Sequence, residues 1–259
     1  MILLETTKLT RAYGGVIAVS QVDFQVREGL ITGLIGPNGA GKTTLFNNMT
    51  GLDTPTSGKV HFNGTDITRH HAHTICRMGI ARTFQNIRLF KELSVLENVM
   101  VGLHFTTGKS PTKGRVAAVV RSYLKAKQEY DLMHERAMRW LEFFKLDGFA
   151  DELAKNLPYG HQRELEIARA LATEPKILFL DEPAAGMNPL ETDSLMKTIR
   201  RIRDLGITVV LIEHDMKLVM NICDTITVLN YGQNIAQGTP AEIRHNPKVI
   251  EAYLGKEEA

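Results

Sequence analysis

The chain has 259 residues, of which 43% are hydrophobic and 23% charged, and its formal net charge is +2. These values are typical of a globular protein, and the charge is too small to indicate nucleic-acid binding. Cys76 and Cys223 lie far apart, which argues against a zinc cluster or a disulfide framework. No run approaches the roughly 18 apolar residues of a spanning helix. The opening MILLETTKLT, interrupted by Glu5 and Lys8, predicts no secretory signal.

Short strand candidates occupy the first third of the chain, at residues 2–7, 22–26, 30–35, 60–62 and 80–84. From about residue 94 to 171 the apolar residues follow helical spacing instead. The two apolar faces of this block are formed by Val95, Val99 and Leu103 and by Trp140, Leu141 and Phe144. We therefore expect a helical lobe between two stretches of mixed structure.

Strands return at residues 177–180 and 208–212, with a predicted helix at about 189–205 between them. Both strands are short, continuous and apolar, which is typical of parallel strands covered by helices on both faces. Two further short strands, 226–229 and 234–236, and a C-terminal helix are expected to follow. The order of elements predicts an α/β core into which the helical lobe is inserted.

The segment GPNGAGKT, residues 36–43, lies between a strand candidate and a predicted helix. Its glycines permit positive φ, so that backbone N–H groups can approach a polyphosphate closely. Lys42 adds a positive charge for the β- and γ-phosphates, and Thr43 offers a hydroxyl to Mg²⁺. The first N–H groups of the following helix favour the same anion. The pattern predicts nucleotide binding, and the alternative is a flexible glycine turn.

Two acids end the strand ILFLDEP, residues 177–183, at the edge where ligands bind in open α/β sheets. Adjacent carboxylates in such a place repel each other and require a cation or a proton, which we expect Mg²⁺ on the nucleotide to supply. We assign Asp181 to the metal, through a water, and Glu182 to the attacking water. The alternative is a pair of surface acids at the start of a helix.

His214 ends the strand TVVLIEH, residues 208–214, at the same edge of the sheet. An imidazole there can reach the γ-phosphate and the attacking water, although a histidine at a strand end is also commonly structural.

These segments, together with RAYGG, RTFQ and LPYGHQRELEIARAL, resemble the ATP-binding subunits of ABC transporters over nearly the whole chain. The resemblance implies one ABC ATPase domain, 1–259, of the α/β class. Its P-loop NTPase (RecA-like) core, residues 1–86 and 172–259, carries an N-terminal antiparallel β subdomain. An inserted α-helical subdomain, residues 87–171, carries the signature motif.

The resemblance also implies the contacts with ATP and Mg²⁺. Tyr13 is expected to stack on adenine, a contact worth roughly 1 to 3 kcal/mol, and its alternative is a tyrosine packed in a turn. Gln85 is expected to touch Mg²⁺ and to link the nucleotide state to the helical lobe. Lys42, Glu182 and His214 are the expected catalytic residues. The expected nucleotide contacts are Tyr13, Gly36, Pro37, Asn38, Gly39, Ala40, Gly41, Lys42, Thr43, Thr44, Gln85 and Asp181, of which Thr43, Gln85 and Asp181 face the metal.

The signature segment departs from the family's LSGGQ. It is formed by Leu157, Pro158, Tyr159, Gly160, His161 and Gln162. Pro158 stands where a serine would hydrogen-bond the γ-phosphate on the partner cassette, and losing such a bond costs about 1.5 to 3 kcal/mol. We therefore predict that the two composite sites of a head-to-tail dimer differ if the partner carries an intact signature.

Three segments narrow the resemblance to the branched-chain amino-acid importer group, the LivG type. They are RTFQNIRLFKELSVLENV, IEHDMKLVM and NPKVIEAYLG. That group implies a second cassette, two transmembrane permease subunits and, indirectly, a periplasmic substrate-binding protein. It places the chain at the cytoplasmic face of the inner membrane, as a peripheral subunit. The alternatives are an exporter ATPase of the lipopolysaccharide type, a soluble ABC ATPase without a permease, and a P-loop kinase or GTPase.

Residues 109–127 hold six basic residues and no acid. The run is either a solvated face or a surface for anionic lipid head groups beside a permease.

Overall fold

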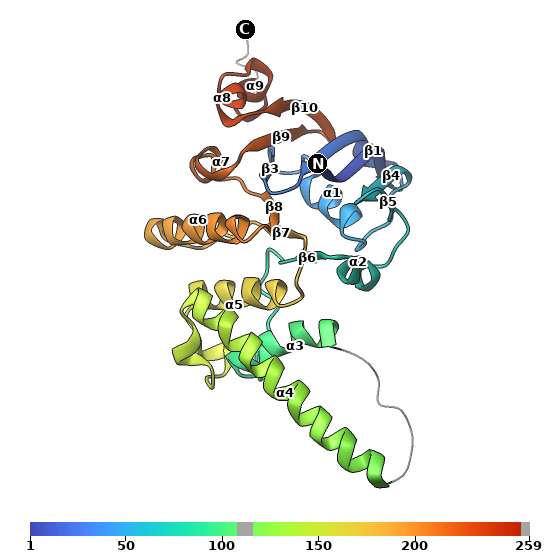
Figure 1. Ribbon diagram of the computed structural model, residues 1–259. Helices are drawn as coiled ribbons and strands as arrows, with labels where there is room; N and C mark the ends of the chain where they lie inside the picture. Colours follow the sequence, from blue (N-terminus) through green and yellow to red (C-terminus); the bar gives the residue numbers. More distant parts are fainter. Residues whose placement is uncertain (108–115, 255–259) are drawn as a thin grey trace. The chain divides into compact units, whose positions relative to one another are not determined.

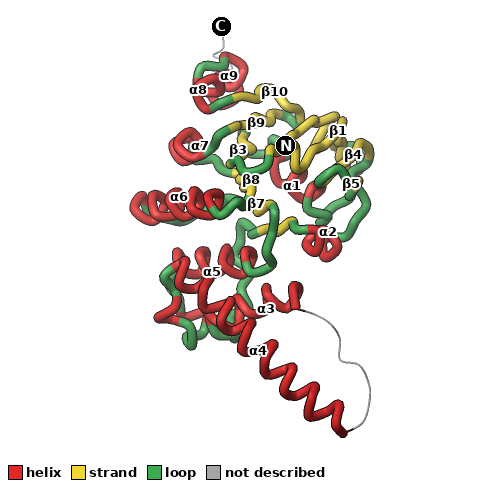
Figure 2. Tube along the Cα trace, viewed as in Figure 1, coloured by secondary structure: helices red, strands yellow, loops and turns green. Residues whose placement is uncertain are grey.

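The computed structural model describes residues 1–107 and 116–254, with side chains described for residues 1–103 and 128–253. It forms two compact units, one of Met1–Gln85 and Lys176–Ala259 and the other of Asn86–Pro175. We predicted the corresponding boundaries after residues 86 and 171. The first unit carries both β-sheets, and the described residues of the second, 86–107 and 116–175, form helices and loops, apart from one bridge between Ser94 and Leu153 (Figures 1 and 2).

The larger sheet of the first unit has six strands. In spatial order they are β10 (Gln233–Gly238), β9 (Thr225–Asn230), β3 (Ile31–Ile35), β8 (Thr208–Ile212), β7 (Ile177–Asp181) and β6 (Ile80–Arg82). All pairs are parallel except β9 with β10. Every residue of β3, β7 and β8 is buried, which agrees with their continuous apolar sequences.

The smaller sheet is antiparallel. Its order is β2 (Val16–Arg27), β1 (Ile2–Tyr13), β4 (Ser57–Phe62) and β5 (Thr65–Asp66). Strands β1 and β2 are 12 residues each and extend well beyond the predicted ranges. The reason is that one face is solvated: Val22, Phe24 and Val26 are buried while the residues between them are exposed, so polar residues also belong to the strand.

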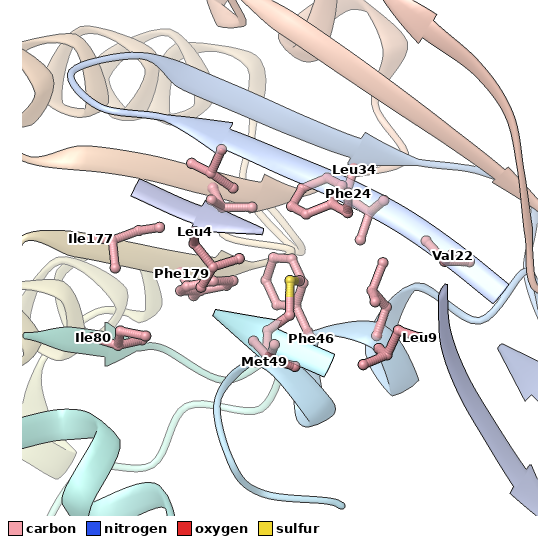
Figure 3. Packing of buried hydrophobic residues seen from close by; sticks show 14 of the residues in the cluster. Leu4, Leu9, Val22, Phe24, Leu34, Phe46, Met49, Ile80, Ile177 and Phe179 are labelled. Carbon is pink, nitrogen blue, oxygen red and sulfur yellow. The ribbon is translucent and has the colours of Figure 1, made fainter. Parts of the chain in front are cut away.

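Helix α1 (Lys42–Met49) joins the two sheets through the core of the first unit. Figure 3 shows Phe46 and Met49 of α1 among side chains of both sheets, and the rings of Phe46 and Phe179 meet edge to face with centroids 4.9 Å apart. Burying each such side chain is worth about 1.5 to 3 kcal/mol. This packing fixes the first residues of α1 relative to the ends of the parallel strands.

Five further helices belong to the first unit, namely α2 (Ala72–Met78), α6 (Pro189–Asp204), α7 (Met216–Ile222), α8 (Pro240–Arg244) and α9 (Pro247–Leu254). The predicted helix at 189–205 is confirmed as α6, which begins with a capping box formed by Asn188 and Glu191. The expected C-terminal helix is confirmed as α9, and Thr239 caps a separate short helix, α8, before it.

The second unit contains α3 (Val95–Thr107), α4 (Val116–Phe144), α5 (Tyr159–Leu171) and two 3₁₀ turns, η1 (Asp147–Phe149) and η2 (Ala154–Asn156). Val95, Val99 and Leu103 are fully buried, so the predicted apolar face of α3 is confirmed. The basic stretch 109–127 lies outside the residues whose side chains are described. No helix within residues 1–107 and 116–254 has both the length and the hydrophobicity to cross a bilayer.

Candidate nucleotide-binding site

The sheet order brings the chemically interesting segments to one edge. Strands β3, β8, β7 and β6 are parallel neighbours, so their carboxyl ends point the same way. The glycine loop follows β3, Glu182 follows β7, His214 follows β8 and Gln85 follows β6. Ligands bind at this edge in open α/β sheets.

The glycine loop is held by close backbone packing. Gly36, Gly39 and Gly41 have φ of 151°, 80° and 95°, values that favour glycine. A Cβ on Gly36 would lie 2.1 Å from the carbonyl oxygen of Leu229, and one on Gly41 would lie 2.3 Å from that of Ala18. Two of the three glycines are therefore required by sterics as well as by φ.

Lys42 lies inside the curve of the loop. Its Nζ donates to the carbonyl oxygens of Gly36 at 2.7 Å and Pro37 at 2.9 Å. Burial lowers the pKa of Lys42, and the nearby carboxylates of Glu182 and Asp181 oppose that shift. Gly41 caps α1 without any side-chain hydrogen bond, so the first amides of the helix have no side-chain acceptor. A cation and helix amides thus face the position where the sequence predicts phosphates.

Arg82 is a partner of Asp181 that the sequence analysis did not identify. An Arg82 NH2 donates to Asp181 Oδ2 at 2.6 Å, with both side chains at most 7% exposed, so the protein supplies a cation beside this carboxylate in addition to the Mg²⁺ that we expected. The sequence signal was an arginine within the predicted strand 80–84, because a guanidinium that is buried requires an acid partner.

Glu182, Gln85 and His214 come together in the first unit. Gln85 Nε2 donates to Glu182 Oε2 at 2.9 Å, and His214 Nδ1 lies 3.8 Å from the same oxygen. Glu182 has φ of 45°, an uncommon conformation for a residue with a side chain, and its N–H donates to the Ile212 carbonyl at 3.0 Å. The structure therefore places two of the predicted site residues, Gln85 and His214, beside one carboxylate oxygen of a third, Glu182.

Glu213 is a further residue that the sequence reasoning missed. Its side chain is 1% exposed, and its oxygens accept from the N–H groups of Ala184 at 2.9 Å and His214 at 3.2 Å. Burial raises the pKa of Glu213, against the effect of these bonds. Glu213 thus ties the turn after Glu182 to the segment that carries His214. Its sequence signal was an acid directly after the apolar strand TVVLI.

Tyr13 ends β1 and is 46% exposed. Its hydroxyl donates to Asp53, and the Arg11 guanidinium lies 4.4 Å from the centre of its ring. Arg11 also pairs with Asp53 at 2.8 Å. The ring is therefore held at its hydroxyl by Asp53 and contacted by the Arg11 guanidinium.

The signature segment begins α5 in the second unit. Pro158 is the N-cap residue and forms no side-chain cap, while Tyr159 is 46% exposed at the first helical position. Gln162 Nε2 donates back to the Leu157 carbonyl at 2.8 Å, and the ring of His161 lies 5.4 Å from that of Phe149. The helix start thus presents backbone amides and a phenol but no serine hydroxyl.

The same helix holds the segment that follows Gln85. Glu166 Oε1 accepts from the Arg88 N–H at 3.0 Å, and Arg169 donates to the Arg88 carbonyl. Glu166 also pairs with the buried Arg163 at 2.9 Å. Burial raises the pKa of Glu166 and lowers that of Arg169. The signature helix α5 therefore hydrogen-bonds both the N–H and the carbonyl oxygen of Arg88.

A glycine loop that encloses a lysine between a parallel strand and a helix, beside an acidic strand end, defines a P-loop nucleotide-binding protein. The family model described as "ABC transporter" matches residues 19–185, which is more than half of the chain. The chain belongs to the ABC transporter family, as an ATPase of the ABC type. A second model, "Branched-chain amino acid ATP-binding cassette transporter", matches residues 233–259.

Two curated relatives align along nearly their whole length. The high-affinity branched-chain amino acid transport ATP-binding protein BraF of Pseudomonas aeruginosa is 48% identical, with 98% of each chain covered. The LivG protein of the same description from Salmonella typhimurium is 46% identical, again with 98% of each chain covered. The resemblance to this group of ATP-binding proteins is thereby confirmed.

Solved structures agree with the fold. A nucleotide-free ATP-binding cassette from an ABC transporter is 35% identical and gives a TM-score of 0.84, covering 99% of this chain and 100% of that one. A dimeric bacterial ABC transporter cassette is 25% identical, with a TM-score of 0.77 over 92% of this chain and 99% of that one. The predicted P-loop NTPase fold with an antiparallel β subdomain is confirmed.

Proposed function

We propose that this chain is the ATP-hydrolysing subunit of an importer for branched-chain amino acids and works with separate permease subunits. The observation that carries the ATPase part is the Lys42 ammonium, enclosed by loop carbonyls beside the Glu182 carboxylate. The amino-acid part rests on the relatives, which give the exporter alternative no support. The first unit would bind the nucleotide and the second would carry the signature.

The described residues fit a bound Mg²⁺. Magnesium prefers oxygen ligands, and Asp181 supplies a carboxylate, Thr43 a hydroxyl and Gln85 an amide carbonyl. The two successive acids, Asp181 and Glu182, lie at one strand end, where a divalent cation lowers their repulsion. When bound, the ion supplies charge neutralisation to the β- and γ-phosphate oxygens.

The chain's own groups account for the rest of the chemistry. The loop amides and Lys42 bind the phosphates and stabilise the charge that develops in the transition state. Glu182 orients the attacking water and accepts its proton, and Gln85 and His214 fix the position of that carboxylate through their contacts with Oε2. Tyr13 stacks on the adenine.

We further propose a head-to-tail pair with a second cassette, in which each signature segment completes the partner's site. Two transmembrane permeases would dock on this pair at the cytoplasmic face of the inner membrane, and a periplasmic substrate-binding protein would deliver the amino acid to them. ATP binding would close the pair and hydrolysis would release it, which switches the permeases between their two orientations.

Glu182→Gln tests the role of the carboxylate. The variant should bind ATP as the wild type does but hydrolyse it at least about 100-fold more slowly, the usual contribution of a general base. ATP binding and phosphate release measured on the same preparation separate these two effects. Glu28→Gln, at an exposed position in the same unit, serves as the control. Hydrolysis by Glu182→Gln at the wild-type rate would remove Glu182 from the mechanism.

A further inference from the structure

Arg82 connects three elements of the first unit. Its NH2 donates to Asp181 Oδ2 at 2.6 Å, at the end of β7. Its NH1 donates to Asn47 Oδ1 at 2.7 Å and to Thr50 Oγ1 at 3.1 Å, at the end of α1. Arg82 itself is the last residue of β6. One guanidinium therefore spans the helix that follows the glycine loop and the strand that carries the acids.

The pair is almost completely removed from water. The side chains of Arg82 and Asp181 are 7% and 4% exposed, so the contact is little screened by solvent. The guanidinium also lies 5.6 Å from the ring centre of Phe46 and 5.3 Å from that of Phe84, which restricts its orientation. A guanidinium restricted in this way offers the carboxylate a fixed donor.

The contact leaves one side of the carboxylate for another partner. Arg82 engages Oδ2, and no donor among the described residues is bonded to Oδ1. An ionised carboxylate offers acceptor sites on both oxygens, so Asp181 can hold a water or a cation on Oδ1 while it stays bound to Arg82.

From this geometry we propose that Arg82 is the positioning residue for Asp181. By holding Oδ2, it would leave Oδ1 available to Mg²⁺, and through Asn47 and Thr50 it would link Asp181 to α1, whose first residues are Lys42 and Thr43. The inference rests on the proposed ATPase function and deepens it. Lysine would not replace Arg82, because an ammonium cannot form the planar fork that reaches Asp181 and Asn47 together.

The test compares ATP affinity in excess Mg²⁺ with ATP affinity in EDTA, measured by calorimetry on the full chain. The ratio of the two is the magnesium-dependent gain. Arg82→Gln should lower this gain by about 10- to 100-fold, as expected when the partner of a metal-binding group is lost. Affinity in EDTA should change little. Arg82→Lys should fall between Arg82→Gln and the wild type.

Asn47→Ala provides a milder variant, because it removes an acceptor from Arg82 without leaving a buried carboxylate unpaired. It should lower the magnesium-dependent gain less than Arg82→Gln does and preserve the fold. Arg203→Gln, which removes the surface contacts with Asp204 and Asp224, is the matched control and should leave the gain unchanged.

Two outcomes would overturn the inference alone. One is an equal loss of ATP affinity in Mg²⁺ and in EDTA for both Arg82→Lys and Asn47→Ala, which indicates a purely structural arginine. The other is a wild-type protein whose ATP affinity does not depend on Mg²⁺. A wild-type protein that binds no ATP in either condition would contradict the proposed function as well.

Discussion

Glu213 contacts the backbone next to two of the proposed catalytic residues, Glu182 and His214. Its two carboxylate oxygens accept from the backbone on either side of the site, at Ala184 and at His214. These bonds fix the turn that carries Glu182 and the start of the segment that carries His214. Removing one partner of such a buried bond costs about 1 to 3 kcal/mol.

The raised pKa of Glu213 predicts a pH dependence of stability. A carboxyl group with a raised pKa in the folded state takes up its proton more readily there than in the unfolded chain. Its contribution to stability is therefore fully present below the ordinary value of 4.5 and is lost as the pH rises through the raised pKa. A tenfold difference in proton affinity between the folded and unfolded chains corresponds to about 1.36 kcal/mol.

Glu213→Gln removes this titration. The free energy of unfolding of the wild type, minus that of the variant, should be largest near pH 4.5 and should decline as the pH rises. Urea unfolding at a series of pH values from about 4.5 to about 8 measures the difference. Glu166 also has a raised pKa but is present in both proteins, so subtraction isolates Glu213. A difference that is constant across this range would contradict the assignment.

At the scale of elements, the start of α5 is the most unusual feature of the chain. A helix N-cap is normally a serine, threonine, aspartate or asparagine whose side chain accepts from the backbone. Here Pro158 occupies the position and forms no such bond. In the proposed pair, the backbone amides of the first turn would remain as anion donors, but residue 158 would offer no hydroxyl to the γ-phosphate.

Pro158→Ser should increase ATP turnover of the dimer by about tenfold or more, because a hydrogen bond to a charged acceptor is worth about 1.5 to 3 kcal/mol and about 1.36 kcal/mol is a factor of ten. Serine also caps the helix, which stabilises it by about 0.5 to 2 kcal/mol. Pro158→Ala tests the loss of the proline ring by itself, since it removes the ring without adding a hydroxyl. If the alanine variant gains as much turnover as the serine variant, or neither changes, the missing hydroxyl is not the cause.

The elements at the sheet edge were predictable because each leaves a local signature. Continuous apolar runs predict β7 and β8, and the spacing of Gly36, Gly39 and Gly41 predicts the loop after β3. The pairing of Arg82 with Asp181 was not predictable in the same way. The two residues are 99 positions apart, and their contact depends on β6 lying beside β7, which no local pattern specifies.

The lengths of β1 and β2 were underestimated for a related reason. The sequences of these long strands contain turn-forming and polar residues, and Thr10 and Gln21 are examples that nevertheless belong to the strands. Pairing with the neighbouring strand extends both strands past their apolar segments, with several register shifts along the way. Tertiary pairing thus overrides local propensity in the antiparallel sheet more than in the parallel one.

At the scale of the whole molecule, the proposed catalytic residues and the signature segment belong to different units. The second unit contains the signature segment. The first unit contains Lys42, Gln85, Asp181, Glu182 and His214. In the proposed head-to-tail pair, this chain's nucleotide is completed by the partner's signature, and its own signature completes the partner's nucleotide. A mixed pair therefore contains two different sites, one of which has the proline-bearing segment.

This asymmetry predicts the effect of disabling each site separately. In a mixed pair whose partner carries an intact signature, Glu182→Gln in this chain removes the site that has the serine hydroxyl. It should abolish most of the ATP turnover. Disabling the partner's own catalytic glutamate should cost about tenfold less, because that site already lacks a bond worth about 1.5 to 3 kcal/mol.

The measurement is ATP turnover of the reconstituted transporter with each site disabled in turn, together with uptake of a branched-chain amino acid. The control is the mixed pair in which this chain carries Pro158→Ser. This substitution restores the hydroxyl to the site that contains the partner's nucleotide, so the losses of turnover on disabling either site should become more nearly equal. Equal losses in the pair without this substitution would mean that the divergent signature supports hydrolysis fully. In that case the backbone amides at the start of α5 would be sufficient to hold the γ-phosphate.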